Sequence, residues 1–455
     1  MKIVIVGDGK VGSTLAQQLC REDHDVTVID RRGDALERTA QELDILCVEG
    51  NGATQAVQLD AGVDQADLLI AATASDELNL LCCLMGKKIG ARHTIARVRN
   101  PEYSADLRLI SEELGLSFSV NPELTCASEI ARNLRVPSAI KTDTFARGHV
   151  ELLKFQLSQD SPLAGKALME LPKLVKARVL ICAVERGEDE IHIPSGAFKL
   201  QAGDRISLVA PMQEARSFFR QMGMVSDPIH QVLIVGGGRI SYYLAKQLLD
   251  AGMSVKIIER DYARCEELST QLPEATILHG DGTNESFLLE AGIEHADAFA
   301  SMTGIDEENV LMSMYVRKTF PKIKVITKLD RHSFRSIVDN MDLGSVYNPR
   351  ISTANQICRF VRTMQNSLGS SVETLYKLCG GKAEALEFRV AASSAVCNIS
   401  LMELKLKPGI LIAAINRGGK IKIPSGRDMI EPGDTVIVVT DILGLSELDA
   451  ILAEE

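Results

Sequence analysis

The sequence contains no run of about 18 consecutive apolar residues, the length that a membrane-spanning helix needs. Its first residues run directly into a strand-like pattern and a glycine turn, without the apolar core and cleavage site of a signal peptide, so none is expected. Neither a Gly-X-Y period nor a long heptad run is present. With 45% hydrophobic and 24% charged residues, the composition predicts a folded soluble protein. The cysteine pattern described below leads us to expect it in the cytoplasm.

An excess of positive charge is also missing. The chain has 50 Lys and Arg residues against 61 Asp and Glu residues, which gives a formal net charge of −11. General nucleic-acid binding needs a cationic footprint on phosphates, and adhesion to an anionic bilayer needs one on lipid headgroups. We therefore expect neither nucleic acid nor direct membrane insertion, and we expect docking on a protein partner.

Cysteine patterns that bind metals or form disulfide frameworks are absent. The ten cysteines are scattered, apart from Cys82-Cys83, and no CxxC pair occurs. The sequence therefore predicts no metal site and reduced thiols used as small apolar residues. The adjacent pair could also be a redox switch, but its helical-looking surroundings favour a place in the core.

Catalytic motifs are missing as well. None of the eight histidines stands in a Lys/His/Asp constellation, and no Walker A or Ser-His-Asp pattern occurs. A dehydrogenase needs an acid or base beside its nicotinamide. We predict a binding protein that is not an enzyme. An NAD-dependent oxidoreductase of duplicated build is the alternative, which NADH oxidation would reveal. A transcription factor would need a helix-turn-helix and a basic face, and neither is found.

What the sequence does contain is a duplication of about 230 residues, the kind of internal repeat to be sought before other features. Ile3–Gly12 recurs as Val232–Ser241, and Val28–Arg31 recurs as Ile257–Arg260, both 229 residues later. Five further markers recur at offsets of 230 or 231: Gly50-Asn51-Gly52 and Gly280-Asp281-Gly282, Thr73-x-x-Asp76-Glu77-x-Asn79 and Thr303-x-x-Asp306-Glu307-x-Asn309, Arg97 and Lys328, Ile191-x-Ile193-Pro194-Ser195-Gly196 and Ile421-x-Ile423-Pro424-Ser425-Gly426, Gly203-Asp204 and Gly433-Asp434.

Each repeat divides into two predicted domains. Short apolar runs alternate with helical patterns in the first part, which is typical of a parallel sheet covered by helices. Hairpin-like strands separated by Gly and Pro-Ser-Gly turns follow, which predicts a small α+β domain. Strands are expected at Lys2–Val6, Asp25–Ile29, Asp67–Ala71 and Thr94–Val98. The expected domains are 1–140, 141–226, 227–372 and 373–455, a tandem duplication of a Rossmann-like domain followed by a small α+β domain.

Two helices are expected to begin at Asn121-Pro122 and Asn348-Pro349, with Asn as the cap and Pro at the first helical position. An apolar stripe at helical spacing follows the first of these starts: Leu124, Ala127, Ile130, Ala131 and Leu134. The spacing favours a helix packed on its own domain. A crossover or dimer-contact helix is the alternative.

The GxGxxG motif at Gly7, Gly9 and Gly12 lies between a predicted strand and a predicted helix. In this context Gly7 makes the tight turn, Gly9 lets a pyrophosphate approach the backbone, and Gly12 lets helix and strand pack closely. Asp30, at the end of the next strand, can accept ribose hydroxyls and would repel a 2′-phosphate, which favours NAD over NADP. Arg31 and Arg32 nearby could hold such a phosphate or lie in solvent. The expected contacts are Gly7, Asp8, Gly9, Lys10, Val11, Asp30, Thr73, Ala74 and Arg97.

The second repeat carries an altered version of this motif. Ser241 replaces the third glycine, Glu259 replaces Asp30, and Lys328 replaces Arg97. Because lysine is a point charge and arginine a planar fork, we expect the two sites to differ in affinity. The expected contacts are Gly236, Gly237, Gly238, Arg239, Ile240, Glu259, Thr303 and Lys328. Basic residues near these strands could help to attract an anion: Lys87, Lys88, Arg92, Arg97, Arg99, Lys318, Lys322, Lys324, Lys328, Arg331 and Arg335.

The ordered set of motifs resembles the RCK (KTN) ligand-binding domains over essentially the whole chain. Two such repeats in one chain are similar to the TrkA-type cytosolic subunits of the Trk potassium uptake system. The resemblance implies NAD(H) as ligand, with ATP and ADP as further candidates. It also implies a homotetrameric ring that docks on a TrkH- or TrkG-type membrane subunit at the inner face of the cell membrane. Bound nucleotides would then shift the pore between its states, to the extent that they bind two shapes of the ring with different affinities.

Overall fold

The computed structural model describes residues 1–101, 103, 111–135, 141–145, 150–187, 190–224, 228–330, 341, 343–366, 372–445 and 447–453. These residues form two compact units, each drawn from both repeats. We call residues 1–130 and 231–360 the Rossmann unit, and residues 131–230 and 361–455 the hairpin unit. The expected domain boundaries at 140 and at 226–227 fall on residues outside the described part.

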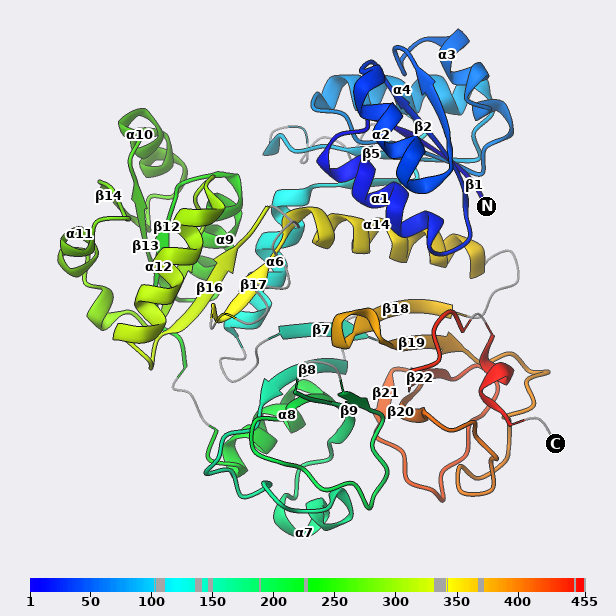
Figure 1. Ribbon diagram of the computed structural model, residues 1–455, viewed down its shortest axis with the longest axis vertical. Helices are drawn as coiled ribbons and strands as arrows, with labels where there is room; N and C mark the ends of the chain where they lie inside the picture. The colour runs from blue at the N-terminus through cyan, green and yellow to red at the C-terminus, as the bar shows by residue number, and fades with distance from the viewer. Residues whose placement is uncertain are drawn as a thin grey trace. The chain divides into compact units, whose positions relative to one another are not determined.

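The first repeat contributes a six-stranded parallel sheet to the Rossmann unit, in the strand order β3-β2-β1-β4-β5-β6 (Figure 1). This is the order of a dinucleotide-binding fold, in which ligands bind at the carboxyl ends of the strands. The elements are β1 (Lys2–Val6), α1 (Lys10–Cys20), β2 (Asp25–Asp30), α2 (Gly33–Leu43), β3 (Leu46–Glu49), α3 (Gln55–Asp60), β4 (Leu68–Ala71), α4 (Asp76–Ile89), β5 (His93–Arg97), β6 (Phe118–Val120) and α6 (Pro122–Leu134).

The second repeat forms the same sheet, in the order β14-β13-β12-β15-β16-β17. The predicted α/β class and the parallel sheets are therefore confirmed. The elements are β12 (Gln231–Val235), α9 (Arg239–Asp250), β13 (Ser254–Glu259), α10 (Tyr262–Gln271), β14 (Thr276–His279), α11 (Glu285–Glu290), β15 (Ala298–Ser301), α12 (Asp306–Thr319), β16 (Lys324–Lys328), β17 (Ser345–Tyr347) and α14 (Pro349–Asn366).

The hairpin unit contains two five-stranded antiparallel sheets, in the orders β10-β9-β11-β8-β7 and β18-β19-β22-β20-β21. One core joins their faces, with Cys182, Val209, Ala385 and Val439 among its members. The elements are β7 (Lys141–Phe145), β8 (Val150–Gln156), α7 (Leu171–Leu174), β9 (Leu180–Arg186), β10 (Glu190–His192), β11 (Arg205–Ala210), α8 (Met212–Gln221), β18 (Val372–Leu378), β19 (Ala383–Arg389), β20 (Ile410–Arg417), β21 (Lys420–Lys422) and β22 (Thr435–Thr440).

Helices α6 and α14 begin as predicted, but each packs against the repeat to which it does not belong. Asn121, at the start of α6, donates from Nδ2 to the Tyr243 hydroxyl at 3.0 Å, and Gln247 on α9 donates to Ser128 at 3.1 Å. On the other side, Gln18 on α1 donates to Asn355 on α14 at 3.4 Å. The favoured prediction, a helix packed on its own domain, is therefore wrong, and the crossover alternative is correct. An apolar stripe shows that a face is buried and does not show against which repeat.

The two crossover helices also contact each other within the Rossmann unit. Thr125 on α6 is hydrogen-bonded to Gln356 on α14, and Ser352 on α14 donates to Glu129 on α6. The rings of Phe118 and Phe360 stack with their centroids 4.9 Å apart. The two Rossmann-like halves are thus joined by an exchange of helices.

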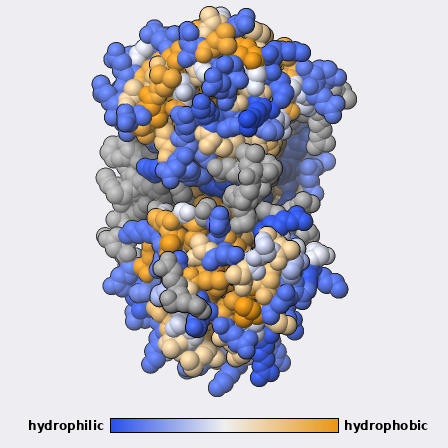
Figure 2. Space-filling view, turned by 90° about the vertical axis from the view of Figure 1, so that its right-hand side faces the viewer, coloured by the Kyte–Doolittle hydropathy of each residue, from blue (hydrophilic) through white to orange (hydrophobic). Residues whose placement is uncertain are grey.

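All ten cysteines are free, and seven of them are buried, including Cys82 and Cys83 on α4. This agrees with their predicted use as small apolar residues. The face in Figure 2 shows hydrophobic patches between hydrophilic side chains. The exposed apolar residues include Leu81 on α4 and Leu311 on α12, which occupy equivalent positions in the two repeats. None of the helices in the described part of the chain has both the length and the apolar character needed to cross a membrane.

Asn79 connects the carboxyl ends of β4 and β5. Its buried side chain accepts from the Thr73 N–H at 2.8 Å and donates to the carbonyls of Thr73, at 3.2 Å, and Arg97, at 2.8 Å. Asn309 makes the same set of bonds to Thr303 and Lys328. The Asn of the repeated Thr-x-x-Asp-Glu-x-Asn motif therefore has a structural role, since it fixes the loop that follows β4.

Replacing Asn79 by Ala is expected to lower the free energy of unfolding by about 2–3 kcal/mol, because several buried N–H and C=O groups lose their partner together. The exposed Gln41 on α2 offers a matched control, and Gln41→Ala should change that free energy by no more than about 0.5 kcal/mol. Urea unfolding of the full chain, followed by circular dichroism, measures both. Equal unfolding midpoints for the two variants would show that Asn79 does not hold this loop.

Candidate functional site

The first glycine loop connects β1 to α1. Gly7 has φ +106°, and a Cβ there would lie 3.0 Å from the Thr73 nitrogen, so only glycine fits. A Cβ on Gly12 would lie 1.8 Å from the Gly7 oxygen, which confirms that this glycine lets the helix approach the strand. Gly9 has an ordinary φ of −81°, and a Cβ there would meet no atom within 4 Å. The fold itself does not require glycine at position 9. Because Gly9 has no side chain, the space beside the loop stays open for a ligand.

The first N–H groups of helix α1 receive no hydrogen bond from a capping side chain. Its N-cap residue Gly9 offers no side-chain hydrogen bond, and no acidic residue lies in its first turn. The same is true of α9 and its N-cap residue Gly238. By contrast, Ser75 caps α4 and Asp261 caps α10. The two uncapped helix ends therefore present N–H groups and a partial positive charge, the combination that binds anions.

The acid after the second strand holds each glycine loop in the same way. Asp30 accepts from the Asp8 N–H at 2.6 Å and from the Arg32 N–H at 3.0 Å. Glu259 accepts from the Gly237 N–H at 2.6 Å and from the Asp261 N–H at 2.8 Å. The extra methylene of glutamate does not change this pattern. Asp30 Oδ1 also accepts from Arg32 Nε at 3.4 Å, so Oδ2 is the Asp30 oxygen with a further lone pair for a ribose hydroxyl, whereas each Glu259 oxygen keeps one.

Asp8 differs from its expected role as a ligand contact. Its carboxylate is buried and accepts from the Thr39 hydroxyl of α2 at 2.8 Å, while its Oδ1 has no hydrogen-bond partner. Burial raises the pKa of the Asp8 carboxyl above its ordinary value, and the Thr39 hydroxyl acts in the opposite direction. The side chain thus ties the glycine loop to α2. Its partner lies 31 residues further along the chain, and the local motif does not reveal it.

Asp76, in the first turn of α4, holds the chain that follows β5. Its carboxylate accepts from the N–H groups of Arg99 and Asn100, both at 2.8 Å. In the second repeat, Asp306 accepts from the Asp330 N–H at 2.8 Å. These bonds fix the chain where it leaves β5 and β16, and they set the direction of the residues that follow.

Arg97 lies where β5 ends, as predicted, and its Nη1 donates to the Thr73 carbonyl at 3.0 Å. Its Nε is buried and has no hydrogen-bond partner. Burial lowers the pKa of the Arg97 guanidinium, with the nearby Arg99 as a further cause. Lys328 makes the equivalent bond to the Thr303 carbonyl at 3.0 Å, and its Nζ also pairs with Asp330 at 3.3 Å.

The next pair of residues has opposite charges in the two repeats. Arg99 is ion-paired with Glu123, the second residue of α6, and its Nε lies 2.6 Å from that carboxylate. In the second repeat the corresponding residues are Asp330 and Arg350 on α14, so that the acid and the base have exchanged places. The guanidinium of Arg350 is half-buried, and this burial lowers its pKa.

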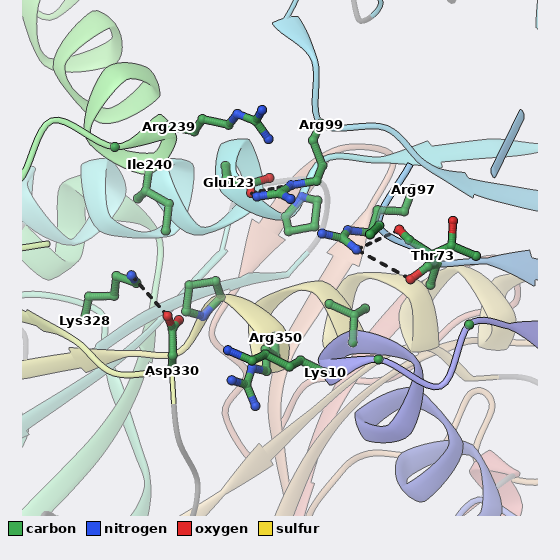
Figure 3. A pocket seen from close by; sticks show the side chains of 18 of the residues that line it. Lys10, Thr73, Arg97, Arg99, Glu123, Arg239, Ile240, Lys328, Asp330 and Arg350 are labelled. Carbon is green, nitrogen blue, oxygen red and sulfur yellow. Dashed lines mark hydrogen bonds and ion pairs between the residues drawn. The ribbon is translucent and has the colours of Figure 1, made fainter. Parts of the chain in front are cut away.

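These groups surround one cavity of about 750 Å³, which we call the central cavity (Figure 3). Both glycine loops line it, together with seven cationic side chains and three carboxylates. In the described part of the chain, the side chains of Lys10, Arg239 and Arg350 make no hydrogen bond or ion pair. The cations are Lys10, Arg32, Arg97, Arg99, Arg239, Lys328 and Arg350, and the carboxylates are Asp30, Glu123 and Asp330. A surplus of unpaired cations at two uncapped helix ends suits a ligand with several negative charges.

Most of the contact residues predicted in the first repeat line the central cavity, and fewer of those predicted in the second repeat do. Those that line it are Gly7, Gly9, Lys10, Val11, Asp30, Thr73, Ala74, Arg97, Gly238, Arg239, Ile240 and Lys328. Those that do not are Asp8, Gly236, Gly237, Glu259 and Thr303. The sequence therefore predicted two separate sites, whereas the structure places both loops on one cavity. Ser241, at the position of Gly12, is accommodated and fully buried.

Sequence reasoning missed Glu123, Asp330 and Arg350 as cavity residues. Glu123 and Arg350 directly follow the two Asn-Pro helix starts, so their position was readable, but only the helix exchange brings them here. Of the basic residues expected to attract an anion, Arg97, Arg99 and Lys328 line the cavity, and Arg331 and Arg335 lie outside the described residues. Among the described residues, no cluster of His, Cys, Asp and Glu side chains could hold a metal ion.

Comparison with known proteins places this geometry in a family. The TrkA-N domain model matches residues 3–122 and 232–349, and the TrkA-C domain model matches residues 152–223 and 385–453. A Trk system potassium uptake protein TrkA homolog of Archaeoglobus fulgidus is 36% identical over 440 residues, which cover 96% of this chain and 97% of that protein. The Trk system potassium uptake protein TrkA of Haemophilus influenzae is 29% identical, with 99% of this chain and 98% of that protein covered.

Solved structures share the fold. The GsuK RCK domain aligns with 96% of this chain and 92% of its own, at a TM-score of 0.62 and 18% identity. The GsuK channel bound to NAD aligns with 96% of this chain and 76% of its own, at a TM-score of 0.62 and 19% identity. The domain models cover most of the sequence in the order of the duplication. The chain therefore belongs to the TrkA family of Trk system potassium uptake proteins.

Proposed function

We propose that this chain is a nucleotide-sensing regulatory subunit of a potassium uptake transporter, and that the central cavity is its nucleotide site. The observation that carries the proposal is the surplus of cations, three of them unpaired, between two uncapped glycine loops. Family membership supports potassium transport as the regulated process. NAD(H) is the proposed ligand, with ATP and ADP as further ligands of the same cationic centre. In this proposal the chain divides into the four domains expected from its sequence.

The proposed partner is a TrkH- or TrkG-type membrane subunit, on which the chain docks as a homotetrameric ring at the inner face of the cell membrane. The acidic charge and the absence of a spanning helix among the described residues fit docking on a protein. A nucleotide held by both repeats can shift the chain between two shapes only by its difference in affinity for them. A typical coupling of about 1–3 kcal/mol corresponds to a change in population of roughly 5- to 150-fold.

We also propose that the chain binds NADH without turning it over. The cavity offers cations and helix ends for phosphates, and its carboxylates are engaged with backbone N–H groups or arginine and lysine side chains. Incubation of the purified chain with NADH and a panel of carbonyl compounds should therefore give no steady loss of absorbance at the NADH band. Repeated turnover above the protein-free rate would instead support the oxidoreductase alternative.

The proposal is tested most simply by adding a carboxylate to each loop. Gly9→Asp would place a negative charge in open space against the phosphates, so NAD affinity should fall by about 100-fold or more, since like-charge contacts cost several kcal/mol. Gly238→Asp should have a smaller effect, because the second repeat contributes fewer contacts. Isothermal titration of the full chain with NAD, ADP and ATP measures both variants.

The exposed Gly196 in the hairpin unit provides the control, since Gly196→Asp adds the same charge far from either loop in the sequence. Its affinities should equal those of the wild type. Identical affinities and ligand order for Gly9→Asp and Gly238→Asp would contradict a site centred on the first repeat, and binding unaffected by either would remove the central cavity as the nucleotide site.

Asp30 provides a test of ligand choice. Asp30→Ala should weaken NAD binding by about 1–3 kcal/mol, the usual cost of losing hydrogen bonds to a charged group. Asp30→Glu should retain most of the affinity, because Glu259 makes the equivalent backbone bonds in the second repeat. The wild type should bind NAD more tightly than NADP. Tighter NADP binding, or an affinity unchanged in Asp30→Ala, would show that Asp30 does not face the ribose.

A further inference from the structure

Gln58 on α3 is a buried polar side chain of the first repeat that lies outside the central cavity. It has no exposed surface, and its Nε2 donates to the Gly52 carbonyl at 2.6 Å and to the Cys82 carbonyl at 3.0 Å. Both partners are acceptors, so only the nitrogen of the amide can face them. Gln58 therefore ties the turn that follows β3 to helix α4.

The other end of this amide is unsatisfied. In the described part of the chain, the buried Oε1 of Gln58 has no hydrogen-bond partner, and such an acceptor lowers the stability of the fold. Gly86 on α4 leaves the space beside it open, since a Cβ on Gly86 would lie 3.4 Å from Gln58 Oε1 and 2.8 Å from Leu69 Cδ1. The amide is thus kept in the core although one of its atoms is destabilising there.

The second repeat fills the same place with apolar side chains. Leu288 stands at the position of Gln58, and Val316 stands at the position of Gly86. Both are buried in the core of the second sheet. A leucine has no group that could donate to the carbonyl of the turn. Since the same fold forms with this apolar pair, the amide in the first repeat calls for a reason other than the stability of the fold.

The turn at Gly50–Gly52 contacts two parts of the first glycine site. The Gly50 N–H donates to the Asp30 carbonyl at 2.8 Å. A Cβ on Gly52 would lie 2.2 Å from Val6 Cγ1, so Gly52 packs directly against the last residue of β1, next to Gly7. A displaced turn would therefore move the acid at position 30 and the glycine loop together.

Helix α4, which the amide also contacts, holds the remaining part of that site. Asn79 accepts from the Thr73 N–H at 2.8 Å, and Asp76 accepts from the Arg99 N–H at 2.8 Å. Cys82 lies about one turn further along the same helix. The Gln58 amide thus connects the half of the site at β1 and β2 with the half at β4 and β5.

We propose that Gln58 is a positioning residue for the nucleotide in the first repeat, because its amide fixes Asp30 and the first glycine loop relative to α4. This inference rests on the proposed nucleotide site. It gives the first repeat a fixed arrangement of its ligand groups that the second repeat, with Leu288 at this position, does not share. It also explains why a destabilising buried oxygen is kept in one repeat and replaced in the other.

The test removes the amide and measures NAD binding to the full chain by isothermal titration. Gln58→Met keeps an unbranched side chain of similar size, and NAD affinity should fall by about 3- to 10-fold, the range that corresponds to one net hydrogen bond. Gln58→Leu, which introduces the residue of the second repeat, should show the same loss. Urea unfolding of each variant establishes that it is folded at the titration temperature.

A second background separates positioning from general loosening of the fold. If Gln58 acts through Asp30, Gln58→Met should change NAD affinity by less than about 2-fold in an Asp30→Ala chain, because the group that it positions is already missing. A merely structural role would give the same loss in both backgrounds. Gln55→Met is the matched control, since Gln55 is an exposed glutamine of the same helix, and it should leave NAD affinity at its starting value in both.

NAD affinity unchanged in Gln58→Met and Gln58→Leu, or an equal loss with and without Asp30, would overturn the positioning role. In either case the nucleotide site itself would stand, provided that the wild type binds NAD and Gly9→Asp weakens that binding. If the wild type did not bind NAD, the proposed nucleotide site would fail, and the role of Gln58 with it.

Discussion

The exchange of α6 and α14 between the two repeats is the contact on which the architecture of the Rossmann unit depends. Each helix begins beside the last strand of its own sheet and then packs on the first helix of the other repeat, through Asn121 and Tyr243 on one side and Gln18 and Asn355 on the other. Because the two helices also hold each other, the halves face one another through their glycine loops. Glu123 and Arg350 reach the central cavity for the same reason. A duplicated chain thereby forms one shared cavity where two separate sites would otherwise be expected.

Duplication followed by divergence explains the uneven share of the two repeats in that cavity. The buried Asn79 and Asn309 keep the same bonds, and Asp30 and Glu259 hold their loops alike. The charged residues beyond β5 and β16 have changed sign instead, with Arg99 and Glu123 in one repeat and Asp330 and Arg350 in the other. The scaffold has thus been preserved while the electrostatics of its ligand face have diverged. This is the pattern expected when one loop holds a ligand and the other contributes charge.

Much of this could be predicted from the sequence, because the signals were local or repeated. The strand at Lys2–Val6 is correct to the residue, two others differ by one residue at one end, and the strand predicted at Thr94–Val98 is displaced by one residue at both ends. Gly7, Gly12 and the acid at position 30 follow from backbone geometry that any such loop needs. The side-chain direction of Asp8 could not be predicted, since it depends on Thr39 in another element. The partner of α6 could not be predicted either, because an amphipathic pattern carries no information about which repeat covers it.

The central claim is that one nucleotide lies in the central cavity and is held by both repeats. A structure of the full chain determined with NAD bound tests it most directly. We expect the ribose at Asp30 and the phosphates at Gly9 and Lys10, within reach of Arg239 of the second repeat. A nucleotide bound outside the central cavity, or one that touches only the first repeat, would contradict this claim.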